Sequence, residues 1–133
     1  MEFKEGGIFE HSRSFSRQAI LQFAELTGDH GAHHTDHTDR IMAHGLLVAS
    51  IVTKIGGDMN YISSDMSMEF REPVYEDEEI TGRLTLVRVK DGKLRTKLEM
   101  KCEVLKADGT VVVNGSSRGQ VLKKSILSRR KGI

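Results

Sequence analysis

Four long segments make up the second half of the chain, and the first three of them alternate apolar and polar residues, a pattern that restricts the fold more than any other feature. The segments cover residues 62–70, 79–90, 93–106 and 110–122. Alternation with a period of two is typical of strands that bury one face and expose the other. Asp91-Gly92 and Asp108-Gly109 separate the last three segments, and Asp-Gly pairs are typical of tight β-hairpins. The sequence therefore predicts a long antiparallel meander.

The positions of the apolar residues predict which side chains share the inner face of each strand. In the first segment the apolar residues occupy even positions: Ile62, Met66, Met68 and Phe70. In the second segment the expected inner face holds Ile80, Leu84 and Leu86. In the third segment it holds Leu94, Leu98, Met100, Cys102 and Val104.

A short strand and a helix are expected near the N-terminus. Residues 7–15 form the strand. Ser16 is a suitable N-cap, because its hydroxyl can accept from the free amides of a first helical turn. Apolar residues then recur at helical spacing until Gly28, which is a suitable C-terminal residue.

A second helix is expected immediately before the meander. Residues 42–55 are apolar on nearly all sides, which predicts a buried helix that Gly56-Gly57 terminates. A buried helix followed by an antiparallel meander indicates an α+β fold, with the helix lying across one face of the sheet.

Composition excludes several classes of protein. The chain has 20 Lys and Arg against 19 Asp and Glu, a balance that argues against a general nucleic-acid-binding protein. No apolar run approaches the roughly 18 residues that cross a bilayer, and the first residues lack the apolar stretch of a signal peptide. A lone cysteine, Cys102, cannot form an intramolecular disulfide, which fits a reducing cytosol. We therefore expect a cytoplasmic protein with no membrane segment and no nucleic-acid partner.

Basic residues are concentrated at the C-terminus. The length of 133 residues fits one domain, which we expect to span residues 1–122. Residues 123–133 hold five basic residues and no acidic residue. We interpret this segment as a solvated, flexible tail, and the alternative is a contact with phosphates on a ligand or partner.

Residues 28–40 carry the most informative polar groups. They contain four of the six histidines and have no apolar period, so we expect a loop directly before the buried helix. Asp29 and His34 lie in this loop. A carboxylate and an imidazole that converge on one water can act as base and acid at neutral pH. Spacing alone favours solvated loop residues over a catalytic pair.

The same loop raises the alternative of a metal site. His30, His33, His34 and His37 lie within eight positions. Zinc sites with such spacing take a second pair of ligands elsewhere, often cysteines, and Cys102 is alone within an expected strand. We therefore expect no metal, and we expect His30 and His37 to be exposed.

His44-Gly45 stands at the expected start of the buried helix. The first amides of a helix have no intrahelical partner and carry the positive end of its dipole. A glycine there lets a ligand oxygen approach the backbone closely, and the alternative role of Gly45 is to permit tight packing against the sheet. Cys102 lies on the apolar face of a strand, which favours a neutral buried thiol over a nucleophile.

Three segments resemble the MaoC-like dehydratase family, which includes the (R)-specific enoyl-CoA hydratases. They are FAELTGDHGAHHTD, IMAHGLLVAS and MSMEFREPVYEDEEI, in this order. The resemblance covers roughly residues 15–122. It implies the hot-dog fold, in which an antiparallel sheet wraps around a long central helix, and it implies a homodimer.

The resemblance also implies roles for individual residues. The family has a GDxNPxHxD loop where this chain has GDHGAHHTD, so Asp29 and His34 match its catalytic pair. Gly45 matches the residue whose backbone amide receives the thioester carbonyl. Thr53 matches a small hydroxyl residue of the central helix that borders the site. We therefore expect His44, Gly45 and Thr53 to bind substrate.

The chain departs from the family pattern in two places. Gly31-Ala32 stands where the family has Asn-Pro, an Asn that helps to order the loop. The segment that follows His34 is shorter than in typical members. His33 is next to His34 and is therefore an alternative member of the pair.

The activity implied by the resemblance is the reversible hydration of trans-2-enoyl thioesters to (R)-3-hydroxyacyl thioesters. Such an enzyme is a lyase of fatty acid metabolism, takes acyl-CoA or acyl-carrier-protein substrates and needs no cofactor. Two alternatives are an acyl-CoA thioesterase of the hot-dog superfamily and a non-catalytic domain that binds acyl-CoA as a sensor or subunit.

Overall fold

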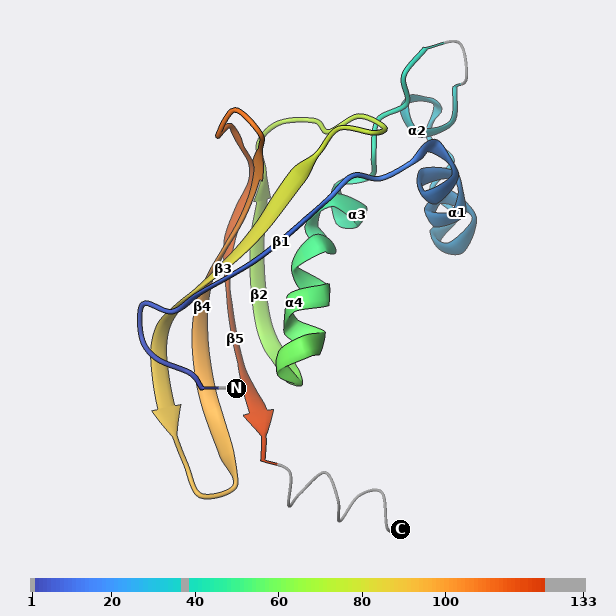
Figure 1. Ribbon diagram of the computed structural model, residues 1–133. Coiled ribbons are helices and arrows are strands. Elements are labelled where there is room, and N and C mark those ends of the chain that lie inside the picture. Colours follow the sequence, from blue (N-terminus) through green and yellow to red (C-terminus); the bar gives the residue numbers. More distant parts are fainter. Residues whose placement is uncertain (1, 37–38, 124–133) are drawn as a thin grey trace.

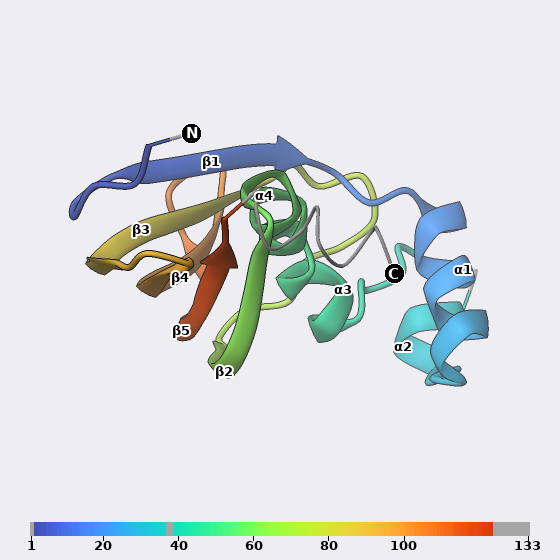
Figure 2. The ribbon, with the colours of Figure 1, turned by 90° about the horizontal axis from the view of Figure 1, so that it is seen from below.

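A curved antiparallel sheet encloses one helix in the computed structural model, which describes residues 2–36 and 39–123. The elements are β1 (Ile8–Arg13), α1 (Arg17–Thr27), α2 (Ala32–Thr35), α3 (Gly45–Ala49), α4 (Ile51–Met59), β2 (Tyr61–Phe70), β3 (Ile80–Asp91), β4 (Arg95–Lys106) and β5 (Val111–Leu122). The sheet order is β1-β3-β4-β5-β2, and every neighbouring pair is antiparallel. Helix α4 lies against the concave face of the sheet (Figures 1 and 2). This is the α+β arrangement that the sequence predicts.

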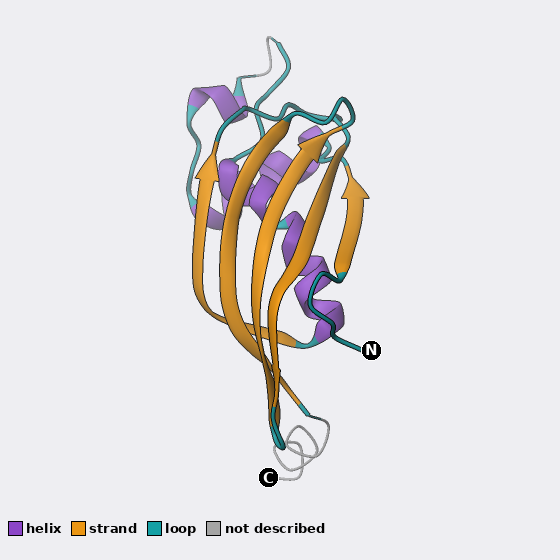
Figure 3. Cartoon of the chain, turned by 90° about the vertical axis from the view of Figure 1, so that its left-hand side faces the viewer, coloured by secondary structure: helices purple, strands orange, loops and turns teal. Residues whose placement is uncertain are grey.

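The three C-terminal strands form a meander (Figure 3), whereas β2, which was predicted to belong to it, pairs with β5 at the edge of the sheet. Ile80, Leu84 and Leu86 of β3 are buried, as expected from their alternation. The inner residues of β4 are also buried, with the exception of Leu94, which precedes the strand and is 48% exposed. These side chains pack against Ile51 and other apolar residues of α4 in one hydrophobic core.

The expected inner face of β2 is wrong at its first residue. A bulge between Ser63 and Asp65 inserts an extra residue opposite β5 and reverses the alternation from that point. Ile62 consequently lies on the opposite face from Met66, although both occupy even positions. Met66 and Phe70 do face the helix side but remain 53% and 51% exposed, because β2 is an edge strand that the chain covers incompletely.

The central helix differs from the predicted span of residues 42–55 at both ends. Met42 is extended and pairs with Tyr75, so the helix begins only at Gly45. A break at Ser50 divides it into α3 and α4. Gly56-Gly57 does not terminate it, because helical hydrogen bonding and the burial of Met59 carry α4 one further half-turn.

Helix α1 has the predicted ends. Ser16 accepts a hydrogen bond from the Ala19 amide at 3.1 Å, and Gly28 closes the helix in the left-handed conformation at φ 80°. Helices α1 and α2 lie beyond the start of α3, away from the sheet (Figures 1 and 2).

A salt bridge joins α1 to the loop after β2. Arg17 donates to Glu76 at 2.5 and 2.9 Å, and Glu76 also accepts from the Ile41 amide at 3.2 Å. Hydrogen bonding from Arg17 holds the pKa of Glu76 below its usual value. The loop that carries the candidate site is therefore fixed at its end by a charged pair.

No helix among the described residues is long and apolar enough to cross a membrane. All but the first residue of the expected basic tail 123–133 lie outside the described residues, as does His37.

Candidate active site

Asp29 follows Gly28, the C-cap residue of α1, and is the exposed member of the predicted pair. Its Oδ1 accepts a hydrogen bond from the Gly31 amide at 3.2 Å. This donation is the largest of the effects that lower the pKa of Asp29, so the carboxylate is ionised at neutral pH. This hydrogen bond also orders the loop. The family pattern has an Asn at the position of Gly31, and here the Asp29 carboxylate bonds to the Gly31 amide.

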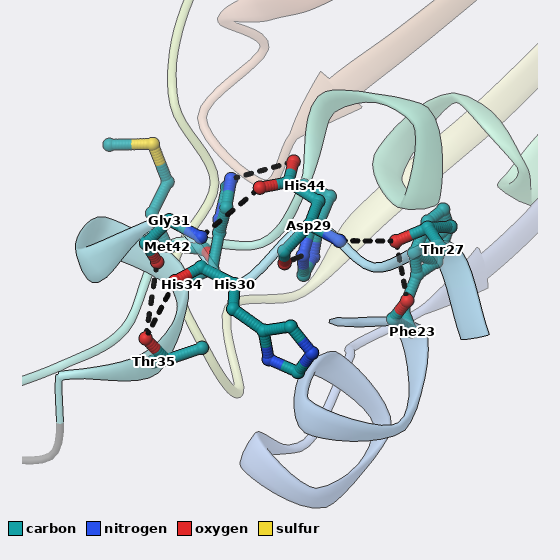
Figure 4. Close-up of polar contacts among 9 residues, drawn as sticks. All are labelled: Phe23, Thr27, Asp29, His30, Gly31, His34, Thr35, Met42 and His44. Carbon is teal, nitrogen blue, oxygen red and sulfur yellow. Dashed lines mark hydrogen bonds and ion pairs between the residues drawn. The ribbon is translucent and has the colours of Figure 1, made fainter. Parts of the chain in front are cut away.

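His34 is the buried member of the pair and lies in the single turn α2, which the sequence did not predict. Its Nδ1 is 2.6 Å from the Met42 carbonyl oxygen, which can only accept, so Nδ1 carries a proton and donates. In the neutral ring Nε2 is therefore a lone pair. Nε2 lies 3.8 Å from Oδ2 of Asp29 (Figure 4). The predicted pair is thus brought together, beyond direct hydrogen-bond distance.

His33 is exposed and its ring lies against that of His34, with centroids 3.8 Å apart. Its neighbour, not His33 itself, is within ion-pair distance of Asp29. Between the two alternatives that the sequence left open, the geometry favours His34.

The His44 side chain is buried against the ring of His34. It is 3% exposed, and its Nε2 donates to the main-chain carbonyl of Asp29 at 3.0 Å. Its ring stacks on His34 with centroids 3.8 Å apart and planes inclined by 16°. The His44 ring is covered by Phe23 and His34, and a role for His44 in binding substrate stays a prediction.

A cavity of about 440 Å³ opens beside His34, and Asp29 is not among the residues that line it. His33, His34 and Gly45 line it together with residues of the loop after β2. Gly45 is the first residue of α3, so its amide lacks an intrahelical carbonyl. A Cβ at Gly45 would lie 3.0 Å from the Phe70 ring, which agrees with the close-packing role considered for this glycine. Gly45 is also exposed, and the approach of a ligand oxygen to its amide stays a prediction.

Thr53 lines a different cavity, of about 230 Å³, further along the same helix. The structure therefore does not place Thr53 beside His34 and Gly45. This second cavity is mainly apolar, but three hydroxyl groups meet in it: Tyr61 and Ser63 each lie within hydrogen-bond distance of Ser117, at 2.7 and 2.8 Å. Sequence reasoning missed these residues, because the bulge in β2 brings Tyr61 and Ser63 to the inner face.

The groups that could hold a metal are the same three side chains. Asp29, His34 and His44 offer ligand atoms within 4.8 Å of one another, which makes them the one such cluster among the described residues. The stacked rings of His34 and His44 direct their in-plane lone pairs along nearly parallel planes. One ion cannot lie in both planes, so the arrangement is poorly suited to a metal. His30 is exposed and pairs with Glu25, as expected for a solvated histidine.

Cys102 is buried in β4, and burial raises the pKa of its thiol to about 11. It is therefore a neutral thiol at physiological pH, as predicted.

No protein-family model matches the chain. A protein of Solanum lycopersicum named 3-hydroxyacyl-(acyl-carrier-protein) dehydratase FERN, mitochondrial, is 29% identical over 126 residues, which cover 86% of this chain and 74% of that protein.

Solved structures share the fold over most of the chain. The (R)-hydratase from A. caviae involved in PHA biosynthesis has a TM-score of 0.80 at 21% identity, covering 91% of this chain and 98% of its own. The MaoC-like dehydratase from Rhodospirillum rubrum has a TM-score of 0.71 at 16% identity, covering 92% and 94%. The predicted hot-dog fold and the resemblance to MaoC-like and (R)-hydratase proteins are confirmed.

Proposed function

We propose that this protein is a hydratase or dehydratase that interconverts trans-2-enoyl thioesters and (R)-3-hydroxyacyl thioesters. The observation that carries the proposal is the pairing of Asp29 Oδ2 with His34 Nε2 across 3.8 Å, next to a cavity with His34 and Gly45 on its wall. Homology to dehydratases and (R)-hydratases agrees with this reaction.

The charge state of the pair suits the activation of one water. The Asp29 carboxylate and the Nε2 lone pair of neutral His34 are both acceptors, so a water between them donates one hydrogen to each. Its oxygen lone pairs then point toward C3 of the enoyl group. One proton leaves the water for the pair as oxygen bonds to C3, and one proton leaves the pair for C2, so the pair is regenerated.

The Gly45 amide supplies the second element of the reaction. Attack at C3 moves electrons through the conjugated system onto the thioester carbonyl oxygen. A backbone amide that has no helical partner stabilises the resulting enolate by donating to this oxygen. No metal or organic cofactor is needed for these steps.

The test is the loss of conjugated enoyl absorbance when purified protein is mixed with crotonyl-CoA, followed by chiral analysis of the product. We expect (R)-3-hydroxybutyryl-CoA and no free thiol. Release of thiol would instead identify a thioesterase, and binding without turnover would identify a non-catalytic acyl-CoA-binding domain. Cys102 does not interfere with a thiol assay, since its pKa is raised to about 11 and its side chain is buried.

We further propose a homodimer. Edge strand β2 exposes Met66 and Phe70 at 53% and 51%, and pairing with a second copy would cover them. Sedimentation of a stable monomer at micromolar concentration would contradict this.

The proposed location is the cytoplasm, with a role in fatty acid metabolism on coenzyme A or acyl-carrier-protein substrates. A single cysteine, Cys102, which has no intramolecular disulfide partner, fits a reducing compartment. The tomato relative is named as mitochondrial, so imaging of the tagged full-length protein is the direct test.

A further inference from the structure

We infer that His44 is a positioning residue that fixes both members of the Asp29–His34 pair to the start of α3. The inference rests on the proposed function for its kinetic test, but its structural basis is independent of the substrate. Three contacts of the buried imidazole carry it.

The first contact is a hydrogen bond to the main chain. His44 Nε2 donates to the carbonyl of Asp29 at 3.0 Å, across fifteen positions of the sequence. Asp29 is otherwise exposed, and its side chain is held by the nearby Gly31 amide. The His44 bond is therefore the long-range contact that ties this exposed loop residue to the buried part of the fold.

The second contact is the stack on His34. The two rings are inclined by only 16° with centroids 3.8 Å apart, so His44 covers one face of the His34 ring. The Met42 carbonyl holds the Nδ1 corner of His34 at 2.6 Å. A ring that is held by a hydrogen bond at one nitrogen can still tilt. The stacked His44 ring restricts this tilt of the His34 ring. Nε2 thereby keeps its direction toward Asp29.

The third contact connects the pair to the Gly45 amide. His44 is the N-cap residue of α3, and its own carbonyl accepts from the Val48 amide at 3.0 Å. The main chain of His44 is thus fixed by its hydrogen bond within α3, and its side chain is fixed by its contacts with Asp29 and His34. Because Gly45 follows directly, one residue sets the distance between the acid–base pair and the proposed enolate donor.

The remaining ring nitrogen argues against a role in packing alone. His44 Nδ1 is buried and has no hydrogen-bond partner among the described residues. A buried polar atom without a partner is unfavourable, and an apolar ring of similar shape would fill the same space without it. The histidine is therefore explained by its Nε2 donor and not by the volume that it fills.

Two substitutions separate the donor from the ring. His44→Phe keeps an aromatic face against His34 and removes the donor, whereas His44→Gln keeps an amide donor near the position of Nε2 and removes the ring. Phe23→Leu is the matched control, because the Phe23 ring also contacts the His44 ring, with centroids 4.9 Å apart, and Phe23 is not part of the pair.

We expect His44→Phe to fold with a melting temperature near or above that of the wild type, and to lose about 10²-fold in kcat on crotonyl-CoA with little change in KM. His44→Gln should recover part of this loss, and Phe23→Leu should stay close to the wild-type kcat. A wild-type kcat in folded His44→Phe would overturn the inference.

A measurement without substrate keeps the inference separate from the proposed function. In ¹⁵N spectra of the wild-type histidine rings, we expect protons on Nε2 of His44 and on Nδ1 of His34, both slow to exchange with water. A His44 ring that exchanges freely, or that carries its proton on Nδ1, would overturn the positioning role even if the enzyme hydrates enoyl thioesters. Protected ring protons in a protein that fails to hydrate them would support the positioning role and refute the proposed function.

Discussion

The two cavities along the central helix hold their polar groups in different ways. In the first cavity's surroundings, each polar side chain bonds to a main-chain atom. Asp29 accepts from the Gly31 amide, His34 donates to the Met42 carbonyl, and His44 donates to the Asp29 carbonyl. In the Thr53 cavity, by contrast, the hydroxyls of Tyr61, Ser63 and Ser117 bond to one another. Main-chain partners occupy one side of a functional group and leave the other free, whereas the hydroxyl cluster satisfies itself. We therefore assign the catalytic role to the first cavity and a structural role to the hydroxyl groups of the second.

The largest effect is expected from Asp29→Asn. The amide preserves the size of the side chain but removes the charge and one acceptor, so hydration of crotonyl-CoA should fall by about 10²–10⁴-fold. The control is His30→Ala, because His30 is an exposed neighbour whose side chain pairs with Glu25. Equal rates in Asp29→Asn and the wild type would remove the distinction between the two cavities.

A smaller effect, on the pH profile, is expected from Gly31→Pro. Gly31 has φ −51°, which proline accepts, so the substitution removes the amide that lowers the Asp29 pKa while the backbone is kept. Removal of this donor raises the Asp29 pKa. The acidic limb of kcat/KM should then move to higher pH, with at least about a tenth of the wild-type rate left at pH 8.

Gly31→Ala is the matched control for this prediction. It also adds a Cβ, which would lie 2.8 Å from the exposed His33 ring, but it keeps the amide. Its acidic limb should coincide with that of the wild type. Identical profiles in the Pro and Ala variants would show that the Gly31 amide does not control Asp29.

Glu76→Gln is expected to affect stability more than catalysis, because Glu76 anchors the end of the site loop and does not line the cavity with His34. The pKa of Glu76 is lowered mainly by Arg17, so its stabilising effect is complete above the ordinary carboxyl range. It disappears as the pH falls through the lowered pKa. The melting temperature of the variant should be a few degrees below the wild type at pH 7, and the difference should narrow toward pH 3. A constant difference across this range would contradict the salt bridge as its cause.

The smallest effect is expected from Tyr61→Phe in the second cavity. Loss of one hydrogen bond to Ser117 should lower the free energy of unfolding by about 1 kcal/mol, measured by urea denaturation. Turnover of crotonyl-CoA should stay within about twofold of the wild type, because no acid–base group is changed. A loss comparable to that of Asp29→Asn would place chemistry in this cavity too.

The sequence predicted those parts of the fold that depend on local pattern. Alternation identified the strands, and the chemistry of Ser16 and Gly28 identified both ends of α1. The prediction was wrong where a contact between residues far apart in the sequence changed the local structure. The bulge after Ser63 reversed the faces of β2, and the pairing of Met42 with Tyr75 delayed the start of the central helix.

The candidate site was predicted in part. Resemblance to a family identified Asp29, His34 and Gly45, and the geometry brings His34 close to both. The burial of His44 and the separation of Thr53 could not be predicted, because they depend on which side of the helix faces the loop. The Met42 carbonyl that sets the His34 tautomer leaves no signal in the sequence, since every residue carries a carbonyl.

The most direct test of the account compares His34→Ala with His33→Ala, alongside the wild type, in the hydration of crotonyl-CoA. The two residues are adjacent in the sequence and both line the cavity, but only His34 is within ion-pair distance of Asp29. We predict that His34→Ala loses about 10²–10⁴-fold in turnover and that His33→Ala retains most of it. Full activity in His34→Ala, or a loss confined to His33→Ala, would contradict the assignment of the pair.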